Sequence, residues 1–522
     1  PPEAPSDNFF ENLAEEIDQR ELGKLAAELL AMYSEDRESR SDWERSYSEG
    51  LGLLGMSTDD RSVPFQGASG VYHPLLSEAV AQLQSSAYKE LLPSGGPVDT
   101  RVVGKVTPER QEQASRVKEF MNYQITEVMQ EYDPEIDQML FYLPLSGSAF
   151  KKIYYDETLG RAVSKFITSE DLVVPYETTD LLSANRITHM IRQNTNDVRK
   201  LQLSGFYRDI ELVPSQEPQT AITEKVDELE GVRATHYSSG EVMTILECHI
   251  NLDLPVFEDE GEDGEPTGIQ LPYIVTMEEG CSEVLSIRRN WEEADPLKNK
   301  KQYFVHYKFL PGLGFYGFGL IHMIGGLTKS VTSILRQLID AGTLANLPAG
   351  FKARGLRVRN DDEPLQPGEW RDVDAPGGAL RDSLLPLPYK EPSGTLLNLL
   401  GVLVDSGRRF AAITEMQTGD MTEAMPVGTT VALLEKGMQV MSAIHKRLHY
   451  SQKIEFRLLA ETFAEYLPQE YPFEIVGGER IVKVTDFSDQ IDVIPHSDPN
   501  IVSMAQRVMM AQTQLQLATS AP

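Results

Sequence analysis

Two short motifs in the chain have the spacing of chemically active sites, and the first is a run of glycines. Gly312, Gly314 and Gly317 have the G-x-G-x-x-G spacing of a dinucleotide-binding turn, between a plausible strand and a helix. Such a turn lets backbone amides approach a pyrophosphate. However, Pro311 precedes the first glycine, and the helix that follows is too long for a crossover. The sequence favours a flexible hinge through which a helix leaves a sheet, with nucleotide binding as the alternative.

The second motif is a pair of histidines, His445 and His449, on one face of a predicted helix. The zinc motif with this spacing has Glu at its second position, where this chain has Lys446, and Arg447 adds another cation. A polar helix face is therefore the preferred interpretation. The sequence contains no P-loop, no G-x-S-x-G elbow and no Cys/His pairing signature. We expect no catalytic residue, no cofactor and no metal, and hence a protein that is not an enzyme.

The composition indicates an acidic protein with several domains. The 522 residues include 48 Lys and Arg against 80 Asp and Glu, for a net charge of −32. This balance argues against a protein that wraps DNA, which normally carries a basic surface. The two cysteines form no CxxC pair, which argues against a disulfide framework and favours a reducing compartment. No apolar run reaches the roughly 20 residues of a membrane span, so we expect no membrane contact.

Hydrophobic periodicity predicts an α+β fold. Helices are expected at 8–34, 73–92 and 107–131, with Thr107 as the N-cap and Pro108 in the first turn of the third. From Phe141 onward the pattern changes to β. Paired strands are expected at 150–156 and 162–167, at 241–251 and 269–278, and around Gly477-Gly478.

The most unusual stretch runs from Phe315 to about residue 467. It contains a predicted helix at 318–345, a Pro/Gly-rich excursion, a second helix at 394–413, a loop at 414–426 and a helix at 428–467. The last helix would be close to 60 Å long at about 1.5 Å per residue. Several methionines of the loop have little local core to enter. It is either a mobile polar loop or a loop that lines a passage.

The order and spacing of several segments resemble the portal proteins of tailed double-stranded-DNA bacteriophages, most closely those of short-tailed phages. The likeness covers most of the chain, and no single segment is specific. The segments are SVPFQGASGVYHPLLSEAV (62–80), SGSAFKKIYYDE (146–157), ITSEDLVVPY (167–176), GFYGFGLIHMIGGLTKSVTSILRQLIDAG (314–342), LANLPAGF (344–351) and MPVGTTVALLE (425–435).

This resemblance implies a portal architecture with named parts. The wing would comprise 1–317 and 428–497, the stem helices 318–345 and 393–413, the clip 346–392, the tunnel loop 414–427, and a crown helix would begin at 498–522. One departure is that too few residues remain for a long crown barrel. The fold class would be an α/β wing, a two-helix stem, a small α/β clip, a tunnel loop and a helical crown.

The resemblance also implies functional surfaces. The DNA-facing tunnel loop would present Glu415, Met416, Gln417, Thr418, Asp420, Met421, Thr422 and Met425. Channel cations of the stem would be Lys329, Arg336, Arg408 and Arg409, which either face DNA or form salt bridges between subunits, the second being favoured. The docking surface of the clip would include Phe351, Arg357, Arg359, Trp370, Arg371 and Arg381.

The implied function is a dodecameric ring at one capsid vertex of the virion, assembled in the bacterial cytoplasm, through which DNA is packaged and ejected. The implied partners are eleven further copies of the chain, double-stranded DNA, the terminase large subunit, head-tail adaptor and tail proteins, and the capsid and scaffolding proteins. The alternatives are a nucleotide-binding enzyme that uses the glycine loop, and a viral adaptor ring without DNA contact.

Overall fold

The structure of the chain is a computed structural model. It contains both helices and sheets in an α+β arrangement, as predicted. The structure describes residues 9–56, 61–213, 220–232, 242–259, 266–346, 350–352, 357–358, 373–374, 384–386, 389–410, 427–475, 478–488 and 490–496. The chain forms two compact units. The first comprises Pro1–Gly52, Glu78–Met323 and Ala412–Pro522, and the second comprises Leu53–Ser77 and Ile324–Ala411.

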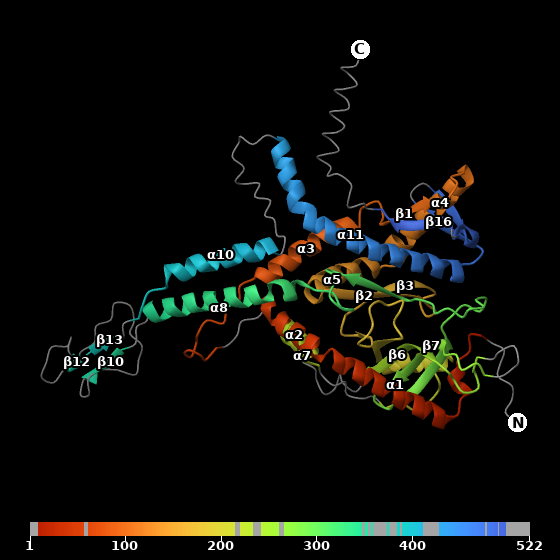
Figure 1. The fold of residues 1–522 in the computed structure, drawn as a ribbon, viewed down its shortest axis with the longest axis horizontal. Helices are drawn as coiled ribbons and strands as arrows, with labels where there is room; N and C mark the ends of the chain where they lie inside the picture. The colour runs from red at the N-terminus through yellow and green to blue at the C-terminus, as the bar shows by residue number, and fades with distance from the viewer. Residues whose placement is uncertain are drawn as a thin grey trace, which may run out of the picture. The chain divides into compact units, whose positions relative to one another are not determined.

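The largest sheet of the first unit has five antiparallel strands in the order β4-β5-β6-β7-β8. Its strands are β4 (Leu172–Val173), β5 (Arg186–Asn194), β6 (Val242–Leu252), β7 (Leu271–Glu278) and β8 (Glu283–Arg289). Helix α1 (Gln19–Ser39) lies along this sheet (Figure 1). Leu22, Ala26 and Leu29 of α1 share a core with Cys248 and Val275 of the sheet, so the apolar face of α1 is buried there.

A second sheet of the first unit has the order β3-β2-β9, with strands β2 (Ser148–Asp156), β3 (Arg161–Ile167) and β9 (Phe304–Lys308). The β2–β3 pair is the predicted hairpin, with Phe150 opposite Ile167. Helix α11 (Val427–Tyr466) contacts all three strands, and helix α5 (Tyr132–Ser146) contacts β2 and β3. The second half of α11 is therefore a core element, with Leu448, Phe456 and Leu459 almost fully buried.

The remaining elements of the first unit are short helices and two-stranded ribbons. They are η1 (Leu13–Glu15), α2 (Ser41–Leu51), η2 (Gly52–Leu54, which enters the second unit), α4 (Pro108–Tyr123), the π-helical turn η3 (Gln124–Val128), α6 (Thr195–Leu203), α7 (Ala221–Glu230), β1 (Val98–Val102) paired with β16 (Ile491–Pro495), β14 (Glu470–Ile475) paired with β15 (Gly478–Lys483), and η4 (Val484–Asp486). Thr107 caps α4 as predicted, since its side chain accepts a hydrogen bond from the Arg110 amide.

Two sequence predictions in this unit need correction. The chain is helical, not β, from Phe141 to Ser146, because α5 continues through Pro144 and ends at Gly147 with φ of 85°. The first long helix begins at Gln19 and not near residue 8, because the Asp18 side chain accepts from the Arg20 amide and starts the helix there.

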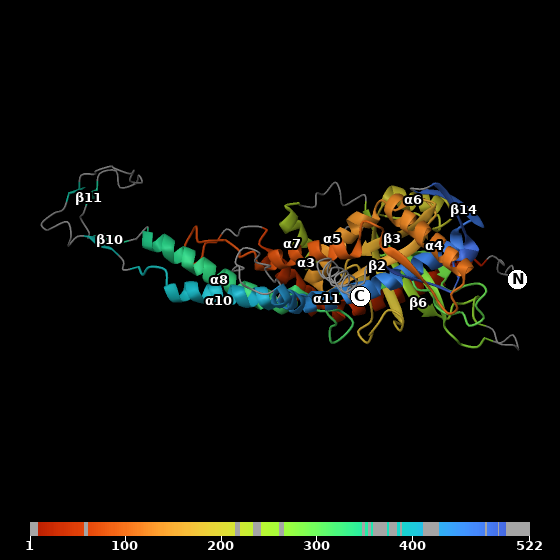
Figure 2. The ribbon, with the colours of Figure 1, turned by 90° about the horizontal axis from the view of Figure 1, so that it is seen from above.

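The second unit contains most of helix α8 (Leu320–Asn346), helix α10 (Gly394–Phe410) and the beginning of helix α3 (Leu75–Leu91). Short strand pairs follow α8: β10 (Gly350–Lys352) with β13 (Leu384–Pro386), and β11 (Arg357–Val358) with β12 (Val373–Asp374). Helices α8 and α10 run alongside each other in both views (Figures 1 and 2). Their bounds agree closely with the two predicted helices, as those of α11 do with the third.

None of the helices in the described part of the chain combines the length and the apolar character that crossing a membrane would require. The predicted crown helix at 498–522 lies outside the described residues.

Candidate functional site

The glycine run before α8 is placed where two backbone segments of the first unit cross. A Cβ atom at Gly317 would lie 2.3 Å from the carbonyl oxygen of Gly147, and one at Gly319 would lie 2.2 Å from that of Leu145. A Cβ atom at Gly312 would lie 2.0 Å from the carbonyl oxygen of Tyr316. These glycines therefore permit a close backbone crossing. Gly314 has no such neighbour within 4 Å.

The amides at the start of α8 already have acceptors within the chain. The Gly317 amide donates to Ser148 Oγ at 2.7 Å, and the Phe318 amide donates to the Leu310 carbonyl at 3.0 Å. The Gly319 amide donates to Nδ1 of His322 at 3.1 Å. A phosphate at this helix end would need these N–H groups. The geometry therefore favours the interpretation of the glycines as a packing feature over that of a nucleotide site.

An arginine and two aromatic rings hold the segment that leads into α8. Nη1 of Arg40 donates to the Ser169 carbonyl at 2.8 Å, to the Leu172 carbonyl at 2.9 Å and to the Tyr316 hydroxyl at 2.9 Å. The Trp43 ring stacks on the Tyr316 ring with centroids 5.0 Å apart and planes 16° from parallel. The segment that precedes α8 is therefore held within the first unit by directional contacts.

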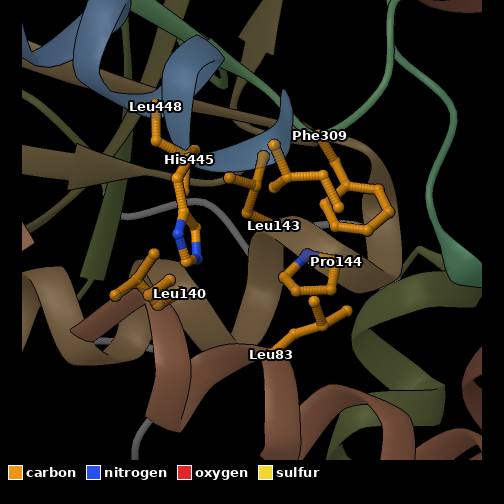
Figure 3. Close-up of a pocket in the computed structure, with 9 residues that line it drawn as sticks. Leu83, Leu140, Leu143, Pro144, Phe309, His445 and Leu448 are labelled. Atoms are coloured by element: carbon orange, nitrogen blue, oxygen red, sulfur yellow. The ribbon is translucent and has the colours of Figure 1, made fainter. Parts of the chain in front are cut away.

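The histidine pair lies on α11 as predicted, next to α3 and α5. His445 borders a cavity of about 10 Å³, otherwise lined by apolar side chains that include Leu83, Leu140 and Leu448 (Figure 3). Burial lowers the pKa of His445, so its neutral form is favoured. The Nε2 atom of His449 lies 3.7 Å from a carboxylate oxygen of Glu90.

Nothing in this arrangement amounts to a metal site. The described residues contain no group of three or more His, Cys, Asp or Glu side chains placed to hold a metal ion. The cavity has room for about one water molecule at most, which is too small for an organic ligand. The pair therefore belongs to the packing between α11 and its neighbours.

A segment that we call the strap, residues 61–73, is bound along α8 within the second unit. Asp340 Oδ1 accepts from the Ser69 amide at 2.7 Å, and Thr332 Oγ1 accepts from the His73 amide at 3.2 Å. Arg336 donates from Nε to the Val71 carbonyl at 2.8 Å. The polar residues of α8 at positions 332, 336 and 340 thus bind the strap backbone from one side of the helix.

Sequence analysis did not predict the contact of the strap with α8, because the two segments are about 260–270 residues apart in the chain. A signal was available nevertheless. Thr332, Arg336 and Asp340 follow each other at intervals of four, which places them on one face of α8 and indicates a polar partner along that face.

The four predicted stem cations have different surroundings. The guanidinium of Arg336 binds the strap and lies 4.3 Å from the centroid of the Tyr72 ring, so this residue fastens its own chain. Lys329 is exposed on α8, and it forms no ion pair with any residue that the structure describes. Arg408 is half-buried and Arg409 exposed, both in the last turn of α10. The structure therefore does not bring the four cations together in one site.

The clip and tunnel-loop predictions fall mostly outside the described residues. The backbone of Phe351 pairs with Leu385, and that of Arg357 pairs with Asp374. Outside the described residues lie Arg359, Trp370, Arg371 and Arg381 of the clip and all eight tunnel-loop residues, Glu415, Met416, Gln417, Thr418, Asp420, Met421, Thr422 and Met425.

Helix α10 leaves several of its apolar side chains in solvent. Leu397, Leu399 and Val402 are 60%, 43% and 62% exposed, although the helix carries no charged residue before Asp405. Close packing is seen near its end, where a Cβ atom at Gly407 would lie 2.5 Å from Leu75 Cδ2. An apolar helix with so much exposed surface indicates an interaction surface.

No protein-family model matches the sequence, and the comparison with curated proteins found no match.

Proposed function

We propose that the chain is the portal subunit of a tailed double-stranded-DNA phage, twelve copies of which form a ring around a DNA channel at one capsid vertex. The observation that carries this proposal is the order of elements from residue 320 to residue 466. Helix α8 is followed by an excursion with two short strand pairs, then by α10, and finally by the 40-residue helix α11. In the proposed assembly, α8 and α10 form the stem and the excursion forms the clip.

The exposed apolar residues of α10 support a ring of identical chains. A face with Leu397 and Val402 about 60% exposed is unfavourable in water unless another surface covers it. A neighbouring copy of the chain would supply that cover through a different surface, and such head-to-tail contacts close into rings. Identical neighbours around an axis would leave no α10 uncovered.

The way α8 is held supports a rigid stem. Within the second unit the strap binds α8 through Thr332, Arg336 and Asp340. A stem that surrounds moving DNA must keep its shape under load, and these contacts would stiffen α8 within that unit.

The charge of the chain is compatible with a conduit. A net charge of −32 leaves few cations to displace counterions from DNA, so phosphates that pass through find few binding sites. Packaging would then be driven by ATP hydrolysis in a terminase partner bound to the clip, which adaptor and tail proteins would replace once the capsid is full.

Electron microscopy of the purified chain tests the proposal. We expect rings with a central hole and twelve subunits in negative stain. A monodisperse monomer at every concentration, together with the absence of such rings from phage particles, would contradict it.

A deletion separates the portal from an adaptor ring that lacks DNA contact. Removing residues 415–424 from the proposed tunnel loop should leave ring assembly intact but reduce the amount of DNA packaged or retained in particles. Unchanged DNA content would favour the adaptor.

A further inference from the structure

The strap and α8 enclose a groove on the surface of the second unit, and the proposed function assigns no role to it. The groove has a volume of about 680 Å³ and lies between Arg61 and Tyr72 on the strap side and Lys329, Ser333 and Gln337 on α8. This volume falls within the range of about 300–1,000 Å³ that is usual for ligand pockets. It has room for several side chains but not for a folded domain.

The charges that line the groove are opposite to those of the chain as a whole. Its lining contains three cations, Arg61, Lys329 and Arg336, and one carboxylate, Asp340, which forms an ion pair with Arg61 at 3.7 Å. Two positive charges are left in excess. The full chain has 80 acidic and 48 basic residues. A local excess of positive charge on an acidic protein attracts carboxylates and repels other cations.

The groove is also partly preorganised. Nε and Nη2 of Arg336 donate to two strap carbonyls, at 2.8 and 3.1 Å, and its guanidinium lies over Tyr72. Arg61 Nη1 donates to the Ser69 carbonyl at 3.0 Å. Cations already held in place lose little conformational entropy when a ligand arrives. Leu53, Pro64 and Leu344 add an apolar part to the lining, which suits a segment with both carboxylates and an apolar side chain.

We propose that this groove receives an acidic segment of a second copy of the chain. The inference rests on the proposed ring, in which each chain meets its neighbour through two different surfaces. A second copy is the occupant that the charges favour, because each copy offers 80 carboxylates. A groove on one side of the chain and an acidic segment elsewhere on it form a heterologous contact, which generates a ring when the rotation closes and does not generate a twofold dimer.

Crosslinking with isotope labels tests the contact directly. Natural-abundance and 15N-labelled chains are mixed before assembly, treated with a carbodiimide that joins amines to carboxylates without a spacer, and digested. We expect the peptide that contains Lys329 to be joined to an acidic peptide of the opposite label. If rings form while Lys329 stays unlinked or is joined only to its own chain, the inference is wrong and the proposed function stands.

A matched pair of variants provides the second test. Gln337→Glu adds a carboxylate inside the groove, whereas Ser330→Glu adds one to an exposed position of α8 outside the groove lining. We expect Gln337→Glu to raise the concentration for half-assembly at least about tenfold, and Ser330→Glu to change it less than about twofold. If the two variants assemble equally well, the inference about the groove is wrong but the proposed ring is not affected. If the wild-type chain stays monomeric, the proposed ring is wrong as well.

Discussion

Lys151 Nζ lies 2.9 Å from Glu455 Oε1, and both side chains are completely excluded from solvent. Ser164 donates to the same carboxylate oxygen at 2.6 Å, and the Tyr307 hydroxyl donates to the other oxygen. The ammonium group also lies 4.0 Å from the centre of the Tyr132 ring. One carboxylate on α11 is therefore bonded to β2, β3 and β9, which fixes the position of the helix on the sheet.

Glu455→Gln should destabilise the first unit by about 3–5 kcal/mol, because it leaves the buried ammonium of Lys151 without a counter-charge. Urea unfolding followed by circular dichroism measures the change. The control is Lys453→Gln, which breaks the more exposed ion pair of Lys453 with Asp492 on the same helix. That change should cost about 1 kcal/mol or less. Equal losses in the two variants would show that the buried pair has no special role.

The elements that sequence analysis located best are those with local signals. Thr107 and Pro108 mark the start of α4, and the apolar periodicity of 318–345 and 428–467 leads to bounds within about two residues of those of α8 and α11. Helix α5 was missed because its apolar stretch before Gly147 is short and contains Pro144, so that periodicity alone does not distinguish it from a buried strand.

The contacts around the candidate site were not predictable in the same way. Gly317 was recognised as part of a special turn, but a glycine is needed there because the backbone at Gly147, about 170 residues earlier in the chain, passes close to it. Arg336 was expected to face DNA or a neighbouring subunit, and the structure places its guanidinium on the strap of its own chain. Such pairings depend on tertiary packing, which no local pattern encodes.

The stability of the first unit should fall as the pH drops below about 6.5, because His189 is held neutral. Burial lowers the pKa of His189 to about 3, and the nearby Lys152 ammonium contributes to the shift. The unfolded chain takes up this proton near pH 6.5, whereas the folded chain does not until far lower pH. The stability due to the neutral imidazole is therefore complete above about pH 6.5 and lost progressively toward pH 3.

Replacing His189 by Gln should reduce the slope of the free energy of unfolding against pH, between pH 6 and pH 4, by up to about 1.4 kcal/mol per pH unit. Urea titrations across that range measure the slope. His496→Gln is the control, because that imidazole is 43% exposed. A slope that stays the same in the His189 variant would contradict the assignment of a neutral buried imidazole.

Gly319→Ala should destabilise the chain by about 2 kcal/mol or more, because its Cβ atom would meet the backbone at Leu145. Gly314→Ala should cost far less, since nothing lies within 4 Å of its Cβ position. Thermal unfolding distinguishes the two.

In the same samples, calorimetric titration with NAD and with ATP should show no saturable heat. Saturable binding that is lost in Gly314→Ala would instead favour the nucleotide-binding alternative.

Leu397→Lys and Val402→Lys, introduced together, should prevent assembly of the ring. These side chains of α10 are about 60% exposed in the single chain, so a neighbour would have to bury the two new ammonium groups at a high desolvation cost. Glu28→Lys is the control, because it changes the net charge by the same amount at an exposed position of α1 in the first unit. Sedimentation velocity should show monomers for the double variant and rings for the control, with unchanged far-UV circular dichroism in both. Rings formed by the double variant would mean that this face of α10 is not covered by another chain.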